Sequence, residues 1–234
     1  MYPELVIDLK KIKNNLDKIT HMVKGAGCSL MIVTKGYCAD IEIYKILENS
    51  DIDYLADSRI ENLKKYEGTK KERVLLRLPM TSQADEVVKY ADISLNSEIT
   101  TIRSLNEAAA EQNKVHKILL MIDLGDLREG IFFKNEEEIY QTAEEILKLQ
   151  NIELFGLGVN LTCYGAVIPK RDNLSVLVDI ARKIENKYNI KLEMISGGNS
   201  SSVYLIEKNE LPVGINNLRV GEAFLLGDET AYSQ

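Results

Sequence analysis

Short apolar runs alternate with amphipathic segments along the whole chain. Near the start, Leu9, Ile12, Leu16, Ile19 and Val23 recur at steps of three and four residues, which predicts a helix with one buried face. Later apolar runs are typical of buried strands, and further helical patterns separate them. The predicted strands are 30–33, 54–56, 74–78, 93–95, 118–122, 154–159, 192–195 and 218–226.

This alternation indicates the fold class. Strands separated by helices suit a parallel sheet covered by helices, and eight strands are the number that closes a barrel. We therefore expect an α/β fold, a (β/α)8 barrel of the TIM type, in which residues 1–234 form one domain. An open doubly wound sheet is the alternative, but it usually has fewer strands and a glycine fingerprint after the first one. Lys35 stands at that position here.

Composition and charge narrow the range of partners. Hydrophobic residues make up 45% of the chain and charged residues 28%, which is typical of a folded domain. The net charge of -7 argues against nucleic acid or an anionic membrane as a partner. No apolar run approaches the roughly 20 residues that span a bilayer, so we expect a cytoplasmic protein. Three cysteines and two histidines are too few and too scattered for a metal site or a disulfide framework.

Candidate chemistry lies where the predicted strands end, because barrels place their active sites at the C-terminal ends of their strands. The polar residues found there are Lys35, Asp57, Ser58, Arg59, Arg77, Asn96, Ser97, Asp123, Arg128, Asn160, Thr162, Cys163, Tyr164, 196–202 and 219–222.

Lys35 follows the first predicted strand, with Thr34 between them. Desolvation lowers the pKa of a lysine amine, which can then act as a nucleophile that forms a Schiff base. The competing interpretation is a lysine that extends from the rim of the barrel into water.

A phosphate site is indicated after the seventh and eighth strands. The run 196–202 reads Ser-Gly-Gly-Asn-Ser-Ser-Ser, and Gly221 lies beside the eighth strand. Small residues let backbone N–H groups approach a phosphate, and barrels often bind phosphate in these two loops. The same residues would also suit a flexible turn.

The segment 123–130 reads Asp-Leu-Gly-Asp-Leu-Arg-Glu-Gly. Its carboxylates could hold a divalent cation, but their spacing is not that of a calcium loop, and Arg128 opposes a cation. An arginine that recognises a carboxylate or orients a cofactor suits the segment better.

A further segment, 217–227, reads Asn-Leu-Arg-Val-Gly-Glu-Ala-Phe-Leu-Leu-Gly. Taken together with Lys35 and the segments 123–130 and 196–202, it resembles the fold-type III pyridoxal-phosphate barrel of the alanine racemase family. The resemblance covers essentially the whole chain and is strongest to members that act on ornithine. It implies that Lys35 is the catalytic residue and forms an internal aldimine with pyridoxal 5′-phosphate. The residues that it places around the cofactor are Arg128 and Asn160 near the ring, Arg219 at the pyridine nitrogen, and Asn199, Ser200, Gly221 and Glu222 around the phosphate.

The function that this resemblance implies is an isomerase, a pyridoxal-phosphate-dependent racemase of a small amino acid such as ornithine. It would remove the α-proton through an aldimine and return it on the opposite face, with Lys35 as acid or base on one face. An arginine at the pyridine nitrogen donates a hydrogen bond without fully protonating the ring, which weakens the electron sink and discourages side reactions.

Two departures from the family pattern keep other functions open. Family racemases take a second-face tyrosine from the C-terminal β-domain of a partner subunit in a homodimer, and we expect that domain to be absent from residues 1–234. Ala39 replaces the tyrosine that usually touches the phosphate, although Tyr37 is near. The main alternative is a single-barrel pyridoxal-phosphate-binding homeostasis protein without racemase activity, which would carry a methionine-bearing loop after strand seven. A cofactor-free barrel acting on sugar phosphates would leave Lys35 and Arg219 unexplained.

Overall fold

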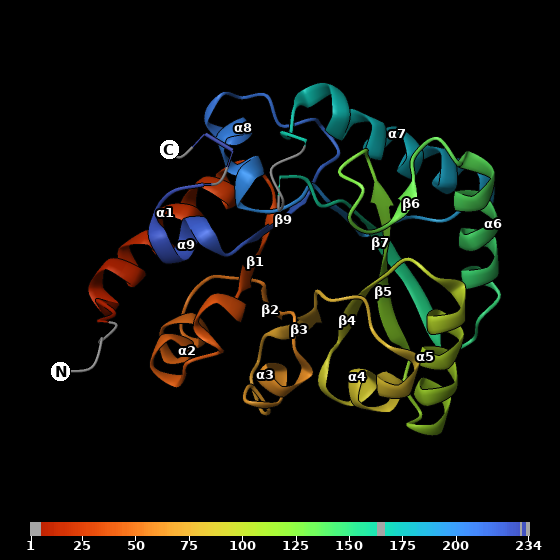
Figure 1. Cartoon of the computed structure of the whole chain (residues 1–234), viewed down its shortest axis with the longest axis horizontal. Coiled ribbons are helices and arrows are strands. Elements are labelled where there is room, and N and C mark those ends of the chain that lie inside the picture. The colour runs from red at the N-terminus through yellow and green to blue at the C-terminus, as the bar shows by residue number, and fades with distance from the viewer. Residues whose placement is uncertain (1–5, 163–166, 230, 233–234) are drawn as a thin grey trace.

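A ring of parallel strands surrounded by helices makes up the computed structural model, which describes residues 6–162, 167–229 and 231–232 (Figure 1). The ring strands are β1 (Ser29–Val33), β2 (Tyr54–Asp57), β3 (Glu72–Leu75), β4 (Ile93–Asn96), β5 (His116–Asp123), β7 (Ile152–Gly158), β8 (Met194–Ser196) and β9 (Asn217–Val220). The remaining strand, β6 (Ile131–Phe132), pairs with the end of β5 outside the ring.

The ring is closed by parallel pairing throughout. Neighbours run in the order β1, β2, β3, β4, β5, β7, β8 and β9, and β9 pairs again with β1. This eight-stranded closed barrel confirms the predicted fold class. Each predicted strand overlaps one ring strand, although several boundaries differ by two or three residues.

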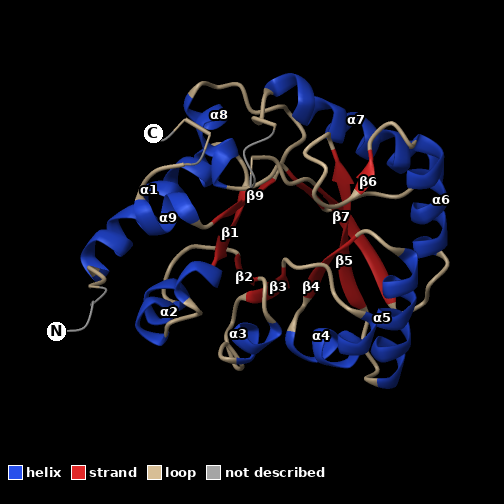
Figure 2. Cartoon of the chain, viewed as in Figure 1, coloured by secondary structure: helices blue, strands red, loops and turns tan. Residues whose placement is uncertain are grey.

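Helices cover the outside of the ring (Figure 2). They are α1 (Leu9–Gly25), α2 (Ile41–Glu48), α3 (Ile60–Lys64), α4 (Ala84–Tyr90), α5 (Ile99–Glu111), α6 (Glu136–Leu147), α7 (Arg171–Tyr188), α8 (Val203–Glu207) and α9 (Glu222–Leu226). Short 3₁₀ turns lie at η1 (Lys35–Tyr37), η2 (Thr81–Gln83) and η3 (Ser200–Ser202). Within the described residues, no helix is long and apolar enough to cross a membrane.

The prediction of a strand over 218–226 is wrong beyond Val220. β9 ends there, and 222–226 form α9 instead. The N–H of Ala223 donates to Ser200 Oγ at 3.2 Å, which satisfies a backbone donor in the first turn of the new helix. A short apolar run cannot by itself distinguish a strand from a buried helix.

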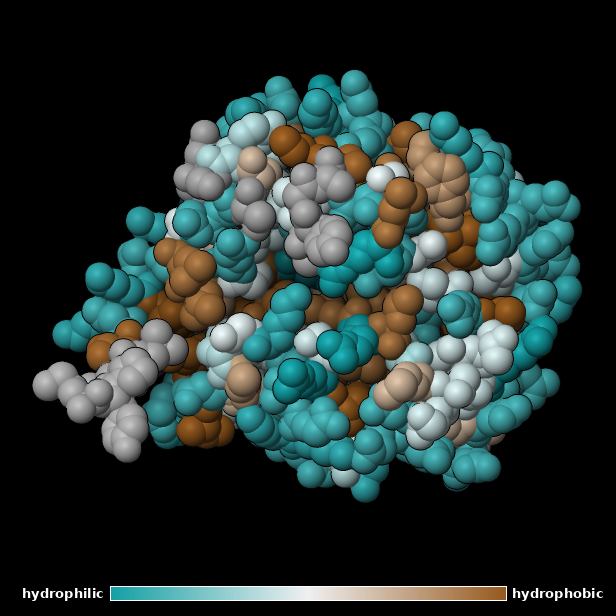
Figure 3. Space-filling model, viewed as in Figure 1, coloured by the Kyte–Doolittle hydropathy of each residue, from teal (hydrophilic) through white to brown (hydrophobic). Residues whose placement is uncertain are grey.

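Two apolar layers form the core. Inside the ring, alternate strand residues such as Met31, Ala56 and Met121 pack against one another. Outside it, the opposite strand faces pack against the helices, and the predicted stripe of α1 is buried at Ile12, Leu16, Ile19 and Val23. In the space-filling view, hydrophilic residues cover most of the periphery and apolar residues are visible near the middle of the face (Figure 3).

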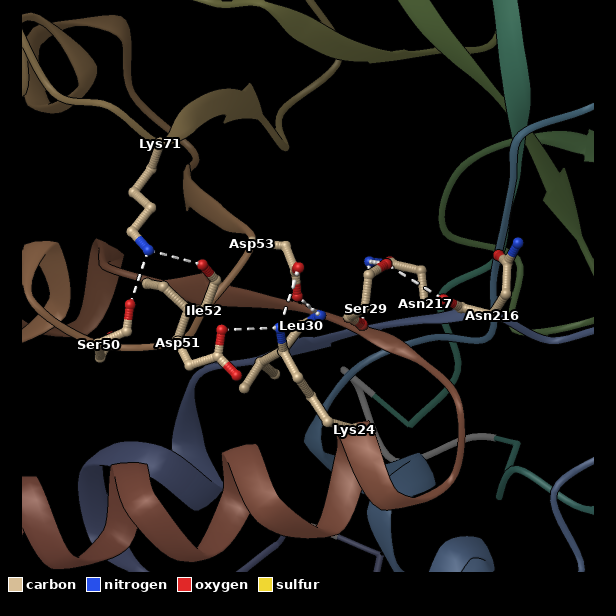
Figure 4. Close-up of polar contacts among 10 residues, drawn as sticks. All are labelled: Lys24, Ser29, Leu30, Ser50, Asp51, Ile52, Asp53, Lys71, Asn216 and Asn217. Carbon is tan, nitrogen blue, oxygen red and sulfur yellow. Dashed lines mark hydrogen bonds and ion pairs between the residues drawn. The ribbon is translucent and has the colours of Figure 1, made fainter.

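Polar contacts hold together the end of the barrel where β1 and β9 begin (Figure 4). Lys24 Nζ lies 3.2 Å from Asp53 Oδ1, and the N–H of Leu30 donates to Asp53 Oδ2 at 2.8 Å. Lys71 Nζ donates to the carbonyls of Ser50 and Ile52 at 2.7 and 2.9 Å. These contacts tie α1, β1 and the turn before β2 together.

Candidate active site

A pocket of about 470 Å³ opens at the C-terminal ends of the ring strands. All the residues that the sequence singled out for the cofactor line it, namely Lys35, Arg128, Asn160, Asn199, Ser200, Arg219, Gly221 and Glu222. The rest of the lining is Val33, Ser58, Leu76, Arg77, Glu129 and Thr162. Lysine and arginine outnumber carboxylates in this lining, which favours an anionic ligand.

Lys35 reaches the pocket because β1 ends at Val33, and the chain turns at Thr34 at that end of the barrel. The N–H of Thr34 donates to the carbonyl of Ala56 at 2.8 Å, and its hydroxyl donates to the buried carboxylate of Asp57 at 2.5 Å. Lys35 then begins the turn η1, and its side chain is exposed. The Lys35 amine makes no hydrogen bond or ion pair with a residue in the described part of the chain, and it lines the pocket where a ligand could reach it.

Tyr37 does not line this pocket, although it lies in the same turn as Lys35. Its hydroxyl is buried, and no hydrogen-bond partner for it lies among the described residues. Burial raises the pKa of Tyr37, and the neighbouring Tyr66 and Asp57 raise it further. This hydroxyl therefore stays protonated, and the Tyr37 side chain packs against the apolar layer outside the ring.

Arg219 projects from β9 into the barrel and is 2% exposed. Its guanidinium donates to Ser196 Oγ at 2.5 Å, to the carbonyl of Val159 at 2.6 Å and to Asn160 Oδ1 at 2.5 Å. A Cβ at Gly158 would lie 2.9 Å from the sulfur of Met121, so the glycine makes room for the Met121 side chain beside Arg219. Oxygen acceptors at the ends of β7 and β8 thus hold this buried cation in a fixed orientation.

A hydrogen-bonded chain connects Arg219 with the loop after β5. Asn160 accepts from Arg219 through Oδ1 and donates through Nδ2 to Glu129 Oε1. Glu129 Oε2 lies 3.8 Å from Arg128 Nε, and the side chain of Glu129 is only 12% exposed. Two arginines of the pocket are therefore linked through one amide and one carboxylate.

The loop after β8 and the start of α9 form a group of hydrogen-bond donors. Ser200 Oγ accepts from the N–H groups of Gly221 and Ala223, each at 3.2 Å, which leaves its own proton available for another acceptor. Asn199 Nδ2 donates to the carbonyl of Leu161 at 2.9 Å and holds the loop in place. The buried Ser201 Oγ has no partner among the described residues. Such a group suits an anion with several acceptor oxygens.

Several other strand-end candidates lie outside the pocket lining. Asn96 Nδ2 donates to Ser94, and Asp123 Oδ1 accepts from the N–H groups of Gly125 and Leu127 at 2.8 and 3.1 Å. These contacts stabilise the ends of β4 and β5. Cys163 and Tyr164 lie outside the described residues.

Glu129 was weighed in the sequence only as a possible metal ligand, and its position in the pocket was missed. Its place between Arg128 and Gly130, in the same polar loop, was the available signal. A second hollow of about 480 Å³ lies on the outer surface and includes Leu16, Thr20 and Ile46, far from the strand-end chemistry.

One cavity is thus lined by a primary amine, by buried and exposed guanidinium groups, and by a group of N–H and O–H donors. The amine can form an imine with a carbonyl compound, while the donors hold an anionic group on the same compound.

Comparison with known proteins finds one matching family and relatives named as racemases. The family model for the alanine racemase N-terminal domain matches residues 7–228. An ornithine racemase of Acetoanaerobium sticklandii is 53% identical over 234 residues, which are all of this chain and 66% of that protein. A lysine racemase of Thermotoga maritima is 38% identical over 229 residues, which are 97% of this chain and 63% of that protein. The chain thus spans just under two thirds of the length of these relatives.

A solved structure also shares the fold. Alanine racemase of Clostridium difficile 630 superposes with a TM-score of 0.76 at 18% identity, covering 93% of this chain and 57% of that one. At this identity the likeness supports the barrel architecture alone.

Proposed function

Because the chain belongs to the alanine racemase N-terminal domain family, we propose that it is the pyridoxal-phosphate-binding barrel of an amino acid racemase acting on ornithine or a related basic amino acid. The observation that carries the proposal is the single pocket in which Lys35, Arg219 and the donors around Ser200 meet. Relatives named for racemising ornithine and lysine support the choice of substrate class.

The residues of the pocket fit the proposed cofactor. Pyridoxal 5′-phosphate carries an aldehyde, a pyridine nitrogen and a phosphate. Lys35 offers an amine for the first, Arg219 a permanently charged donor for the second, and the loop at Asn199 and Ser200 donors for the third. The buried Ser201 hydroxyl, which has no partner among the residues that the structure describes, supports an acceptor at this position. The bound cofactor would act as the electron sink that lets an amino acid lose its α-proton.

Lys35 has two parts in this proposal. Its exposed Nζ would hold the cofactor and, when free, would be the group that accepts or donates the proton at the substrate Cα on its own face. An arginine keeps its proton, so Arg219 would donate a hydrogen bond to the ring nitrogen without fully protonating it. Arg128, which is more exposed, orients the ring or a substrate carboxylate.

Inversion needs an acid or base on the second face as well. We propose that a homodimer partner supplies it from the family's C-terminal domain, with residues 1–234 acting as the barrel domain. A cytoplasmic location is part of the same proposal, because the free thiols of Cys28 and Cys38 suit a reducing compartment.

Cofactor attachment is the direct test. Protein incubated with pyridoxal 5′-phosphate and reduced with borohydride should carry one pyridoxyl group on the peptide that contains Lys35, and Lys35→Ala should carry none. Label on Lys65, an exposed lysine near the same turn, would show that the site assignment is wrong. Attachment at Lys35 without racemisation, even when the second acid or base is supplied, would favour the cofactor-homeostasis function.

A further inference from the structure

Glu129 lies at one end of the hydrogen-bonded chain that reaches Arg219. Its carboxylate lines the pocket and accepts from Asn160 Nδ2, while the opposite end of the same amide accepts from Arg219 Nη2 at 2.5 Å. Glu129 belongs to the loop after β5, Asn160 follows β7, and Arg219 belongs to β9. Three segments far apart in sequence are therefore linked above the barrel.

The Asn160 amide can lie between Glu129 and Arg219 in only one orientation. An asparagine side chain has a donor end and an acceptor end, whereas an ionised carboxylate only accepts and a guanidinium only donates. With Glu129 on one side, Asn160 must turn its NH₂ toward the carboxylate and its oxygen toward Arg219. The reverse orientation would set donor against donor at Arg219 and acceptor against acceptor at Glu129.

The other contacts of Arg219 hold only one side of its guanidinium, so the contact with Asn160 is also needed to fix its orientation. Ser196 and Val159 hold the guanidinium from inside the barrel, and the Ser196 hydroxyl in turn donates to Asn217 at 2.6 Å. These acceptors are neutral; Ser196 ends β8 and Val159 directly follows β7, so they fix the guanidinium at its barrel side. Asn160 lies in a loop, and its orientation depends on Glu129.

We propose that Glu129 is a positioning residue of the proposed racemase site, which orients Asn160 and thereby holds Arg219 in place for the pyridine nitrogen. The same carboxylate lies beside Arg128 and keeps that side chain near the pocket. The inference rests on the proposed function, because Arg219 acts there on the bound cofactor.

Exchanging the carboxylate of Glu129 and the amide of Asn160 tests the proposal. Asn160→Asp places two carboxylates against each other and should weaken pyridoxal 5′-phosphate binding about tenfold. Glu129→Gln alone keeps an acceptor for Asn160 but loses the charge that fixes the amide, so it should weaken binding about threefold, less than Asn160→Asp. The double variant restores one donor and one acceptor in swapped order, so its affinity should recover to within about threefold. Each substitution is isosteric and opens no cavity.

The readouts are the cofactor dissociation constant from absorbance titration and the visible circular dichroism of the bound cofactor, which reports its orientation. Glu107→Gln, at an exposed position on α5, is the matched control and should change neither. An unchanged Asn160→Asp variant, or a double variant no better than Asn160→Asp, would each overturn the inference. Failure of the unchanged protein to bind the cofactor would instead overturn the proposed function.

Discussion

Lys35 and Arg219 carry the same formal charge in opposite surroundings. Lys35 is exposed at the rim of the pocket, whereas Arg219 is 2% exposed and donates to three oxygens. An amine that forms and breaks a covalent bond needs an accessible, mobile side chain, and a donor that must keep its proton can be buried and fixed. The two environments therefore suit the two proposed roles.

His116 provides a prediction about pH and stability. It is 2% exposed and hydrogen-bonds with Ser94 Oγ at 2.8 Å. Burial lowers its pKa from 6.5 to about 4, so between these values the unfolded chain binds a proton that the folded chain does not. Stability therefore falls as pH falls through this window. From pH 7.5 to 5.5 we expect His116 to remove about 1.4 kcal/mol from the free energy of unfolding.

Urea unfolding at both pH values checks this expectation. His116→Gln keeps a polar partner for Ser94 but does not titrate in this range, so it should lose less stability than the unchanged protein on acidification. The exposed His21 is present in both proteins and cancels in the comparison. Equal losses in the two proteins would contradict the assignment of the pH effect to His116.

The positions of the pocket residues were predictable, but their partners were not. Strand ends of a parallel barrel converge at one face whatever their loops do, so Lys35 and Arg219 could be placed together from their positions alone. The bond between Asn160 and Glu129 joins loops 31 residues apart, and no periodic pattern encodes it. Such side-chain contacts depend on how two loops pack.

At the scale of elements, the loop after β5 depends on Gly130. Its φ is +112°, and a Cβ there would lie 2.7 Å from the backbone nitrogen of Asp123. Gly130→Ala should therefore destabilise the protein by about 2 to 4 kcal/mol through strain and displacement of β5. Because the loop carries Arg128 and Glu129 into the pocket, cofactor affinity should fall as well.

Gly125→Ala is the control in the same loop. Its φ is +110°, but nothing lies within 4 Å of the added Cβ, so only the backbone strain of about 1 to 2 kcal/mol applies. Thermal or urea unfolding measures both variants. A Gly130→Ala variant no less stable than Gly125→Ala would show that the close approach to β5 is relieved without cost.

Elements were predicted well where a pattern was long, and poorly where it was short. The 17-residue helix α1 has a regular buried stripe, and the prediction was confirmed. The two-residue strand β6 is too short to leave a pattern. The start of α9 depends on the contact between Ala223 and Ser200, which are 23 residues apart in sequence, so the run after Val220 gave no local sign of the change from strand to helix.

At the scale of the whole molecule, the two ends of the barrel have different roles: one end forms the pocket, and contacts at the other stabilise the fold. Asp53 lies at the end opposite the pocket, where it accepts from Leu30 N–H and faces Lys24 (Figure 4). Asp53→Ala should lower the free energy of unfolding by about 1 to 2 kcal/mol, because it leaves a backbone donor without its partner. Cofactor affinity should not change, since no pocket residue contacts Asp53.

Asp51→Ala serves as the matched variant at the same end. Its side chain is 85% exposed and lies 3.3 Å from the same lysine, so its loss should cost less than about 0.5 kcal/mol. Urea unfolding and cofactor titration are measured on both proteins. A fall in cofactor affinity in Asp53→Ala alone would mean that the two ends are coupled through the barrel.

The last prediction concerns the proposal that the barrel acts on one face of the substrate and the C-terminal domain of a partner subunit on the other. Residues 1–234 produced on their own should exchange the α-proton of one enantiomer of ornithine with deuterium oxide through Lys35, but should invert either enantiomer poorly. A missing acid or base typically costs about 10² to 10⁴ in rate, so adding the C-terminal domain of a family racemase should restore inversion by a factor in that range. Mass spectrometry of the amino acid and chiral chromatography follow the two events separately, and Lys35→Ala should abolish both. Rapid inversion of both enantiomers by the 234 residues alone would place the second acid or base within them, and Tyr164 would be the first residue to replace.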